Sequence, residues 1–193
     1  QHEIESLLVR WGHARDSDDW ETLAACFHEG ATIHISWISG PATDFVTRSR
    51  DLAGKRKPGE HTKHLVGGPW IEVAGERAFS RSHATLYIRR VIDGHAYDLQ
   101  SWLRFFDLLE RRDGNWAIVK RTGVYEKDNM VPVDPRGGPE DFFDDLEKVE
   151  FGMGNKFLSY THLKTGRTPA TGIVQAFSED EQALLAEGRN WLG

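Results

Sequence analysis

The chain has 193 residues, enough for one generous domain or for a domain of roughly 130 residues with a long extension. Hydrophobic residues make up 39% and charged residues 28%, which is ordinary for a globular protein. The net charge of −6 argues against a nucleic-acid partner, because phosphate contacts need clustered Lys and Arg. No apolar run reaches the roughly 18 residues of a membrane span, so we expect no membrane partner either.

The first 60 residues predict three helices and one strand. Apolar residues at helical spacing predict a first helix over 2–15, and the polar run 15–19 is typical of a turn. A second helix follows from Trp20 and is expected to end at 28–30, where Gly30 suits a left-handed terminus. Residues 31–37 then predict a strand, and 41–52 a third helix.

From residue 61 onward the hydrophobic period changes from 3.6 toward 2. Two Asp-Gly steps, at 93–94 and 113–114, predict tight hairpins, and Gly67-Gly68 predicts a bulge inside the first long strand. The expected strands are 61–74, 77–91, 95–110 and 116–126. The chain is therefore predicted to be an α+β fold, a cone-shaped curled antiparallel sheet capped by three N-terminal helices, with an interior cavity.

The residues beyond the sheet form a separate segment. We divide the chain into a domain over 1–127 and an extension over 128–193, which begins with a Pro- and Gly-rich linker. A helix is expected to begin near Glu140, and a capping box at Ser178 to Glu181 predicts a final helix to about Asn190. The extension is apolar enough to pack on its own domain or on a neighbouring subunit.

The chain contains one cysteine, Cys26. Cys26 excludes an internal disulfide and a multi-cysteine zinc site, and its place in a helical pattern indicates a small buried residue. One thiol is compatible with a reducing compartment, and we expect a cytoplasmic protein. No signal-peptide pattern opens the chain; because it begins at Gln1 instead of Met, the question of a removed leader stays open.

Asp16 and His64 are the strongest candidates for catalysis. A carboxylate bound to one imidazole nitrogen fixes the tautomer and leaves the other nitrogen as a general base. Asp16 follows the first helix and His64 lies three residues before the Gly67-Gly68 step. Spacing alone equally allows Asp16 to cap the second helix and His64 to be a core histidine.

Three short motifs resemble the SnoaL-like branch of the nuclear transport factor 2-like superfamily, which includes scytalone dehydratase. They are Arg15-Asp16-Ser17-Asp18-Asp19-Trp20, His64-Leu65-Val66-Gly67-Gly68 and Asp113-Gly114-Asn115-Trp116, and the likeness covers roughly residues 2–127. The resemblance implies that Asp16 and His64 form a catalytic dyad. It also implies a homodimer or homotrimer, with the extension as the place for subunit contacts or a lid over the pocket.

Two departures from scytalone dehydratase concern groups that assist the base. Arg15 stands where that enzyme has Tyr, and the position of its second active-site histidine falls near Arg89. The resemblance therefore supports the base and leaves the substrate open.

Five further residues are candidates for substrate binding. Trp37 and Tyr125 are plausible pocket walls. Arg121 suits either a salt bridge inside the sheet or contact with an anion or carbonyl. Gln100 suits either an inward hydrogen bond to substrate or an exposed strand face. His83 shares a face with polar residues, which favours an outward position, but an inward one stays possible.

No metal or nucleotide cofactor is expected. His61 and His64 are three apart, which on a strand places their side chains on opposite faces. Neither a phosphate-binding loop nor a dinucleotide fingerprint is present.

The leading hypothesis is a cofactor-independent lyase, most simply a dehydratase, acting on a small hydrophobic, cyclic or aromatic substrate in an apolar cavity. The same base would also suit an isomerase, a cyclase or an aldehyde-releasing C–C lyase. A second hypothesis is a non-catalytic role, as a ligand-binding protein or as the structural β-subunit of an aromatic-ring dioxygenase, which shares the fold implied by the resemblance.

Overall fold

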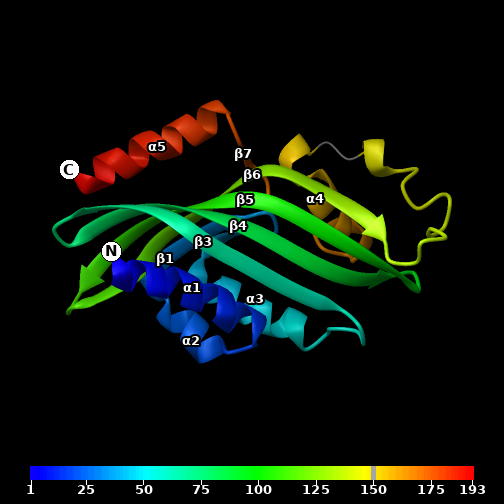
Figure 1. The fold of residues 1–193 in the computed structure, drawn as a ribbon, viewed down its shortest axis with the longest axis horizontal. Helices are drawn as coiled ribbons and strands as arrows, with labels where there is room; N and C mark the ends of the chain where they lie inside the picture. Colours follow the sequence, from blue (N-terminus) through cyan, green and yellow to red (C-terminus); the bar gives the residue numbers. More distant parts are fainter. Residues whose placement is uncertain (149–150) are drawn as a thin grey trace.

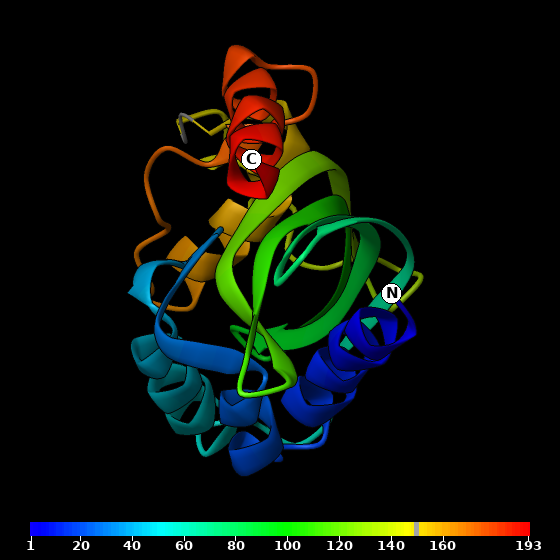
Figure 2. The same cartoon turned by 90° about the vertical axis from the view of Figure 1, so that its left-hand side faces the viewer.

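The protein is built around a strongly curled, open sheet of seven strands. The computed structural model describes residues 1–148 and 151–193, and Figures 1 and 2 show helices on both sides of the sheet. The strand order is β2-β1-β6-β5-β4-β3, with β7 beside β6. The strands are β1 (Phe27–Ile35), β2 (Ile38–Pro41), β3 (His61–Ala74), β4 (Arg77–Ile92), β5 (His95–Arg112), β6 (Asn115–Pro132) and β7 (Val174–Gln175). The predicted α+β class with a curled sheet and N-terminal helices is confirmed.

The four long strands, β3 to β6, form an antiparallel meander joined by tight turns. Asp93 and Gly94 have φ values of 49° and 81°, and Asp113 and Gly114 have 50° and 80°. Two successive left-handed residues give the turn whose twist matches that of the flanking strands. The sequence predicted this part of the sheet because each hairpin is specified by neighbouring residues.

The sheet is mixed, whereas the sequence predicted an antiparallel one. β1 runs parallel to β6, with Ile33 opposite Arg121, and β7 also runs parallel to β6. The short strand β2 pairs with β1 and was missed. Parallel partners are joined through long crossovers, so local patterns carry no signal for them.

A bulge bends β3 at the predicted position. The register with β4 shifts between Gly67 and Trp70, and Gly68 has a φ of 56°, which favours glycine.

Three helices pack against the concave face of the sheet: α1 (His2–Asp16), α2 (Trp20–Ala25) and α3 (Ala42–Ala53). The buried stripe of α1 includes Ile4, Leu7, Leu8 and Trp11. Burial of such side chains contributes about 1.5–3 kcal/mol each.

The second helix is shorter than expected. Asp19 caps α2 by accepting a hydrogen bond from the Thr22 amide at 3.0 Å, and the helix ends at Ala25. Gly30 does have a positive φ, 77°, but it lies inside β1, where the register with β6 shifts between Phe27 and Thr32. A glycine in the left-handed region fits a bulge as well as a helix end, which explains the wrong boundary.

The C-terminal extension packs on the sheet in two places. α4 (Lys156–Lys164) follows two 3-10 turns, η1 (Leu146–Lys148) and η2 (Met153–Asn155). Only turns follow Glu140 before η1, so the helix predicted there is wrong over 141–145, and residues 149–150 lie outside the described part.

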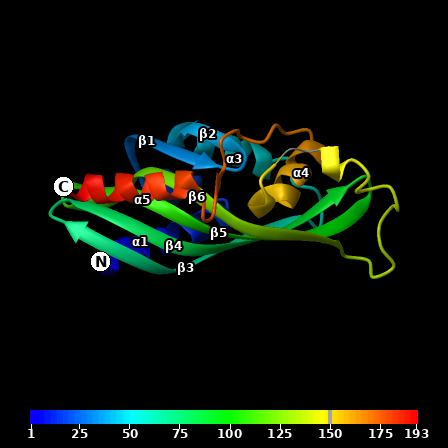
Figure 3. The same cartoon turned by 90° about the horizontal axis from the view of Figure 1, so that it is seen from above.

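The last helix, α5 (Glu179–Leu192), begins at the predicted capping box, where the Glu181 amide donates to Ser178 Oγ at 3.2 Å. It covers the convex face, where Phe79, Phe106 and Val124 form a second apolar cluster. Figure 3 shows α5 lying along the strands. The division at residue 127 stays a prediction; β6 continues across it to Pro132.

Across the described residues, no helix combines the length and the apolar character needed to cross a membrane.

Candidate active site

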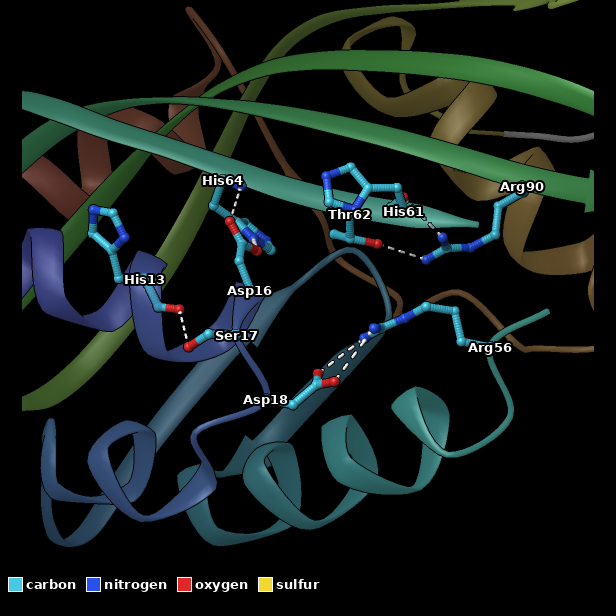
Figure 4. A network of polar contacts seen from close by, with 9 residues as sticks. All are labelled: His13, Asp16, Ser17, Asp18, Arg56, His61, Thr62, His64 and Arg90. Atoms are coloured by element: carbon cyan, nitrogen blue, oxygen red, sulfur yellow. Dashed lines mark hydrogen bonds and ion pairs between the residues drawn. The ribbon is translucent and has the colours of Figure 1, made fainter. Parts of the chain in front are cut away.

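Asp16 and His64 are in direct contact. Asp16 is the last residue of α1, and its two carboxylate oxygens bind one residue of β3: Oδ1 lies 2.6 Å from His64 Nδ1, and Oδ2 accepts the His64 backbone N–H at 2.6 Å. Figure 4 shows the carboxylate pointing from the helix to the strand. The carboxylate therefore fixes both the ring and the backbone that carries it.

Close packing of α1 on β3 makes this contact possible. Gly12 is buried, and a Cβ added there would lie 3.5 Å from Val66 and 3.6 Å from the His64 carbonyl oxygen. These are ordinary contact distances, so alanine would fit at this position, whereas a longer side chain would meet the strand. The Asp16 and His64 side chains are 18% and 13% exposed, so their hydrogen bond is only weakly screened by water.

Burial and the neighbouring carboxylate act in opposite directions on the imidazole. Burial lowers the pKa of His64 below its usual value, while the hydrogen bond and charge of Asp16 raise it and Arg15 lowers it again. The net result is a neutral ring at pH 7. With Nδ1–H donated to Asp16, the lone pair lies on Nε2, to which none of the residues in 1–148 and 151–193 donates a hydrogen bond.

His64 lines a cavity of about 420 Å³ between the concave face of the sheet, the helices and α4. Its inner walls are apolar and mostly aromatic: Trp11, Trp37, Phe45, Leu103, Phe105 and Tyr125. Trp11 is a direct neighbour of the base, with ring centroids 5.4 Å apart in an edge-on arrangement. A volume of this size suits a small organic molecule.

Two of the predicted binding residues, Trp37 and Tyr125, line this cavity. The Tyr125 hydroxyl oxygen accepts the Ser36 backbone N–H at 2.9 Å, so its own proton is available to another acceptor. Burial raises the pKa of Tyr125, which keeps that proton on the oxygen.

The structure contradicts the predicted substrate contact of Arg121. Its side chain is 0% exposed and forms two hydrogen bonds with Asp107, at 2.7 and 2.9 Å. The guanidinium lies 4.3 Å from the ring centroids of both Trp11 and Phe105. Arg121 is therefore a buried ion pair that supports the wall behind these rings, as in the alternative of a salt bridge inside the sheet.

Gln100 and His83 do not face the cavity either. Alternation along β5 turns Leu99, Ser101 and Leu103 inward, which places Gln100 on the opposite face. His83 is exposed on β4, where its ring packs near the Gly68 bulge. For both residues the structure therefore shows the outward alternative, which was already the favoured one for His83: strand faces alternate, and the cavity lies on the other side.

His162 of α4 is a cavity residue that the sequence did not reveal. Its Nε2 lies 3.3 Å from Ser36 Oγ, and its Nδ1 is buried without a partner among the described residues. Burial lowers the pKa of His162 well below the usual value, so the ring is neutral. No motif marks this position, because α4 reaches the cavity only through the folding of the extension.

The remaining candidates for chemistry do not lead to a site. Cys26 is buried, its thiol donates to the Thr22 carbonyl at 3.3 Å, and burial raises its pKa. Within the described ranges, no three or more His, Cys, Asp or Glu side chains are arranged to hold a metal ion.

Comparisons with known proteins agree with this fold. Pea pathogenicity protein 2 from Fusarium vanettenii is 32% identical over 98% of this chain and 84% of its own length. A solved structure from Novosphingobium aromaticivorans named for scytalone dehydratase has a TM-score of 0.56 at 20% identity, covering 66% of this chain and 85% of the other. The structure of LinA has a TM-score of 0.56 at 19% identity, covering 69% and 89%. A family profile described as "SnoaL-like domain" matches residues 1–122, and the chain belongs to this family.

Proposed function

We propose that the protein is a cofactor-independent lyase, a dehydratase, in which His64 is the general base and Asp16 orients it. The observation that carries this proposal is the double contact of Asp16 with the His64 ring and backbone, beside a cavity of about 420 Å³. A base held in one tautomer at the wall of a small-molecule cavity is suited to removing a proton from carbon.

The reaction begins when His64 Nε2 takes a proton from a carbon next to a carbonyl group. The C–H electrons form the new C=C bond, the hydroxyl on the adjacent carbon leaves, and the imidazolium returns the proton to it as water. Asp16 stabilises the imidazolium between the two steps without taking its proton. One well-placed base contributes about 10²–10⁴-fold, so other groups must stabilise the developing oxyanion.

Tyr125 and His162 are suited to that second task. The Tyr125 hydroxyl is positioned by the Ser36 amide, and its proton stays available. His162 has an imidazole nitrogen without a partner among the described residues. Both line the cavity with His64, and either can donate a hydrogen bond to a substrate carbonyl oxygen.

The inner walls support a cyclic or aromatic substrate. Trp11 packs against two phenylalanine rings: it is stacked on Phe45 at 5.9 Å and edge-on to Phe105 at 5.3 Å. Flat apolar walls of this kind bind rings, and they exclude water from a reactive enolate.

The test uses a panel of cyclic and aromatic β-hydroxyketones in D₂O. NMR follows exchange of the α-proton, and enone absorbance follows loss of water. We expect His64→Ala to lower the rate by about 10²–10⁴-fold and Asp16→Asn to lower it by a smaller factor. His83→Ala is the matched control, because His83 is exposed on the outer face of the neighbouring strand.

Equal rates in the wild type and in both dyad variants would overturn the proposal. If the α-proton exchanges in a His64-dependent way but no water is lost, His64 remains the assigned base and the assigned reaction becomes isomerisation. Binding of ring compounds without exchange would support the non-catalytic alternative.

A further inference from the structure

The lining of the cavity carries many basic side chains, although the protein as a whole is acidic. Seven Lys and Arg side chains line the cavity, against only two carboxylates, Glu60 and Asp93. This is a local excess of five positive charges in a chain whose net charge is −6. Such a contrast indicates a binding preference of the cavity, because the average surface would give the opposite sign.

Some of these cations already have a partner. Arg56 binds Asp18 at 2.9 Å, as Figure 4 shows, and Lys164 binds Asp145 at 3.1 Å. Glu60 is engaged elsewhere, since its two oxygens accept the backbone N–H groups of Lys57 and Val91 at 3.0 Å.

Three arginines have no carboxylate within salt-bridge distance among residues 1–148 and 151–193: Arg15, Arg90 and Arg167. Arg90 donates to two backbone carbonyls, of His61 and Arg89, and to Thr62 Oγ1 at 3.0 Å. Arg167 donates to Thr165 Oγ1 at 3.1 Å. Each guanidinium carries five N–H donors, so donors remain for a ligand.

The three guanidinium groups are partly withdrawn from water and repel one another. The pKa values of Arg15 and Arg167 are both lowered to about 10, chiefly by burial and in part by the charge of the nearby Arg90. The carboxylates Asp16 and Asp18 act in the opposite direction on Arg15, and Glu60 does so on Arg167. Burial also lowers the pKa of Arg90. All three stay charged at pH 7, and buried cations are stabilised when an anion pairs with them.

These arginines lie close to the base. Arg90 binds Thr62, which lies on the same face of β3 as His64, two residues away, or about 6.6 Å along the strand. Arg15 directly precedes Asp16 and contributes to the field at His64.

We propose that the ligand of this cavity is a ring compound that carries a carboxylate, with the ring beside His64 and the carboxylate bound by Arg90, Arg167 and Arg15. This inference names the substrate class and rests on the proposed function. A planar carboxylate matches the paired donors of a guanidinium.

The experiment measures binding, so it does not depend on turnover. Benzoate, 2-naphthoate and cyclohexanecarboxylate are each compared with their neutral primary amide by titration calorimetry on the full chain. We expect the carboxylate to bind about 10- to 100-fold more tightly than the amide. Arg90→Gln and Arg167→Gln should each remove most of this preference, and Arg90→Lys should retain part of it.

Arg89→Gln is the matched control. Arg89 neighbours Arg90 on β4 but is exposed on the other face, paired with Asp98 at 2.6 Å. It should keep the full preference for the carboxylate. Melting temperatures of all variants show that each is folded, and Arg167 lies outside regular structure, so its replacement leaves the sheet unchanged.

The proposal is overturned if no carboxylate binds more tightly than its amide, or if Arg90→Gln and Arg167→Gln keep the preference. His64→Ala separates this result from the proposed function: it should lower turnover by about 10²–10⁴-fold and keep the preference for the carboxylate. If the protein turns over neutral ketones but shows no preference for a carboxylate over its amide, the anion site is contradicted and the proposed function is not.

Discussion

Asp16 acts on His64 through both of its carboxylate oxygens. One oxygen holds the ring nitrogen and the other holds the backbone N–H of the same residue, each at 2.6 Å. The replacement Asp16→Asn keeps the size of the side chain, removes its charge and leaves one acceptor oxygen for the two His64 donors. This is why the pH dependence of the variant is more informative than its activity alone.

The acid limb of kcat/KM is expected below pH 6.5, the ordinary pKa of histidine. The base is the neutral ring, and burial lowers its pKa, so the active form persists to lower pH. In Asp16→Asn the effect that raises the pKa is lost, so the limb should move further down while the plateau falls. Profiles of kcat/KM between pH 4.5 and 8 for the wild type and Asp16→Asn check both expectations. An acid limb that moves to higher pH in Asp16→Asn would contradict the assignment of His64 as the base.

Arg121 and Asp107 differ from other ion pairs of the sheet because both are fully buried. Arg121→Met leaves the Asp107 carboxylate without a partner, and we expect a loss of about 3–5 kcal/mol in the free energy of unfolding. The double change Arg121→Met with Asp107→Leu should recover much of it. Urea denaturation measures the loss, with Arg89→Gln as the exposed control that leaves stability unchanged. Equal stability of Arg121→Met and the wild type would show that the pair is dispensable.

Among helices and strands, α5 lies unusually close to the sheet. Gly188 faces Phe79, and a Cβ added there would lie 2.6 Å from the ring. Gly188→Ala should gain about 1 kcal/mol in helix propensity but lose about 1–3 kcal/mol by overpacking. We expect a net loss of stability in urea denaturation. Asn190 is exposed on the same helix, so Asn190→Ala should show only the gain in helix propensity. If Gly188→Ala is more stable than the wild type, α5 does not pack closely against Phe79.

Local patterns accounted for α1, α5 and the four long strands, because helical period, capping and Asp-Gly turns are written in neighbouring residues. They did not reveal the short strand β2. They also did not reveal the parallel pairing of β1 with β6, which joins residues about 90 positions apart. The end of α2 was misplaced because a glycine with positive φ suits both a helix end and a bulge.

The site was predictable to a similar degree. Asp16, His64, Trp37 and Tyr125 lie at the cavity or support it. Motifs indicated the first two, and aromatic character alone suggested the last two. His162 and Arg167 come from the extension, and only the tertiary fold brings them to the cavity. Gln100, His83 and Arg121 were polar residues on strands, for which one sequence does not say which face the cavity uses.

At the scale of the whole molecule, one part of the extension lines the cavity and another part covers the convex face of the sheet. Cavity-lining residues extend as far as Arg167, while α5 covers only the convex face. Deletion of residues 179–193 should therefore keep carboxylate binding and expose the apolar cluster of Phe79, Phe106 and Val124. We expect a lower melting temperature, stronger binding of a hydrophobic dye and self-association in light scattering. Loss of binding in a folded deletion variant would contradict this division.

The parallel pairing of β1 with β6 also affects how the protein is made. β1 ends at Ile35, and its partner residues on β6 lie between Ile118 and Thr122, so one edge of β1 has no partner until the ribosome has added about 90 residues. At 5–20 residues per second, this takes about 5–18 s. During that time the unpaired strand edge can pair wrongly with other chains. Synthesis at high temperature or high expression should therefore produce aggregates from nascent chains.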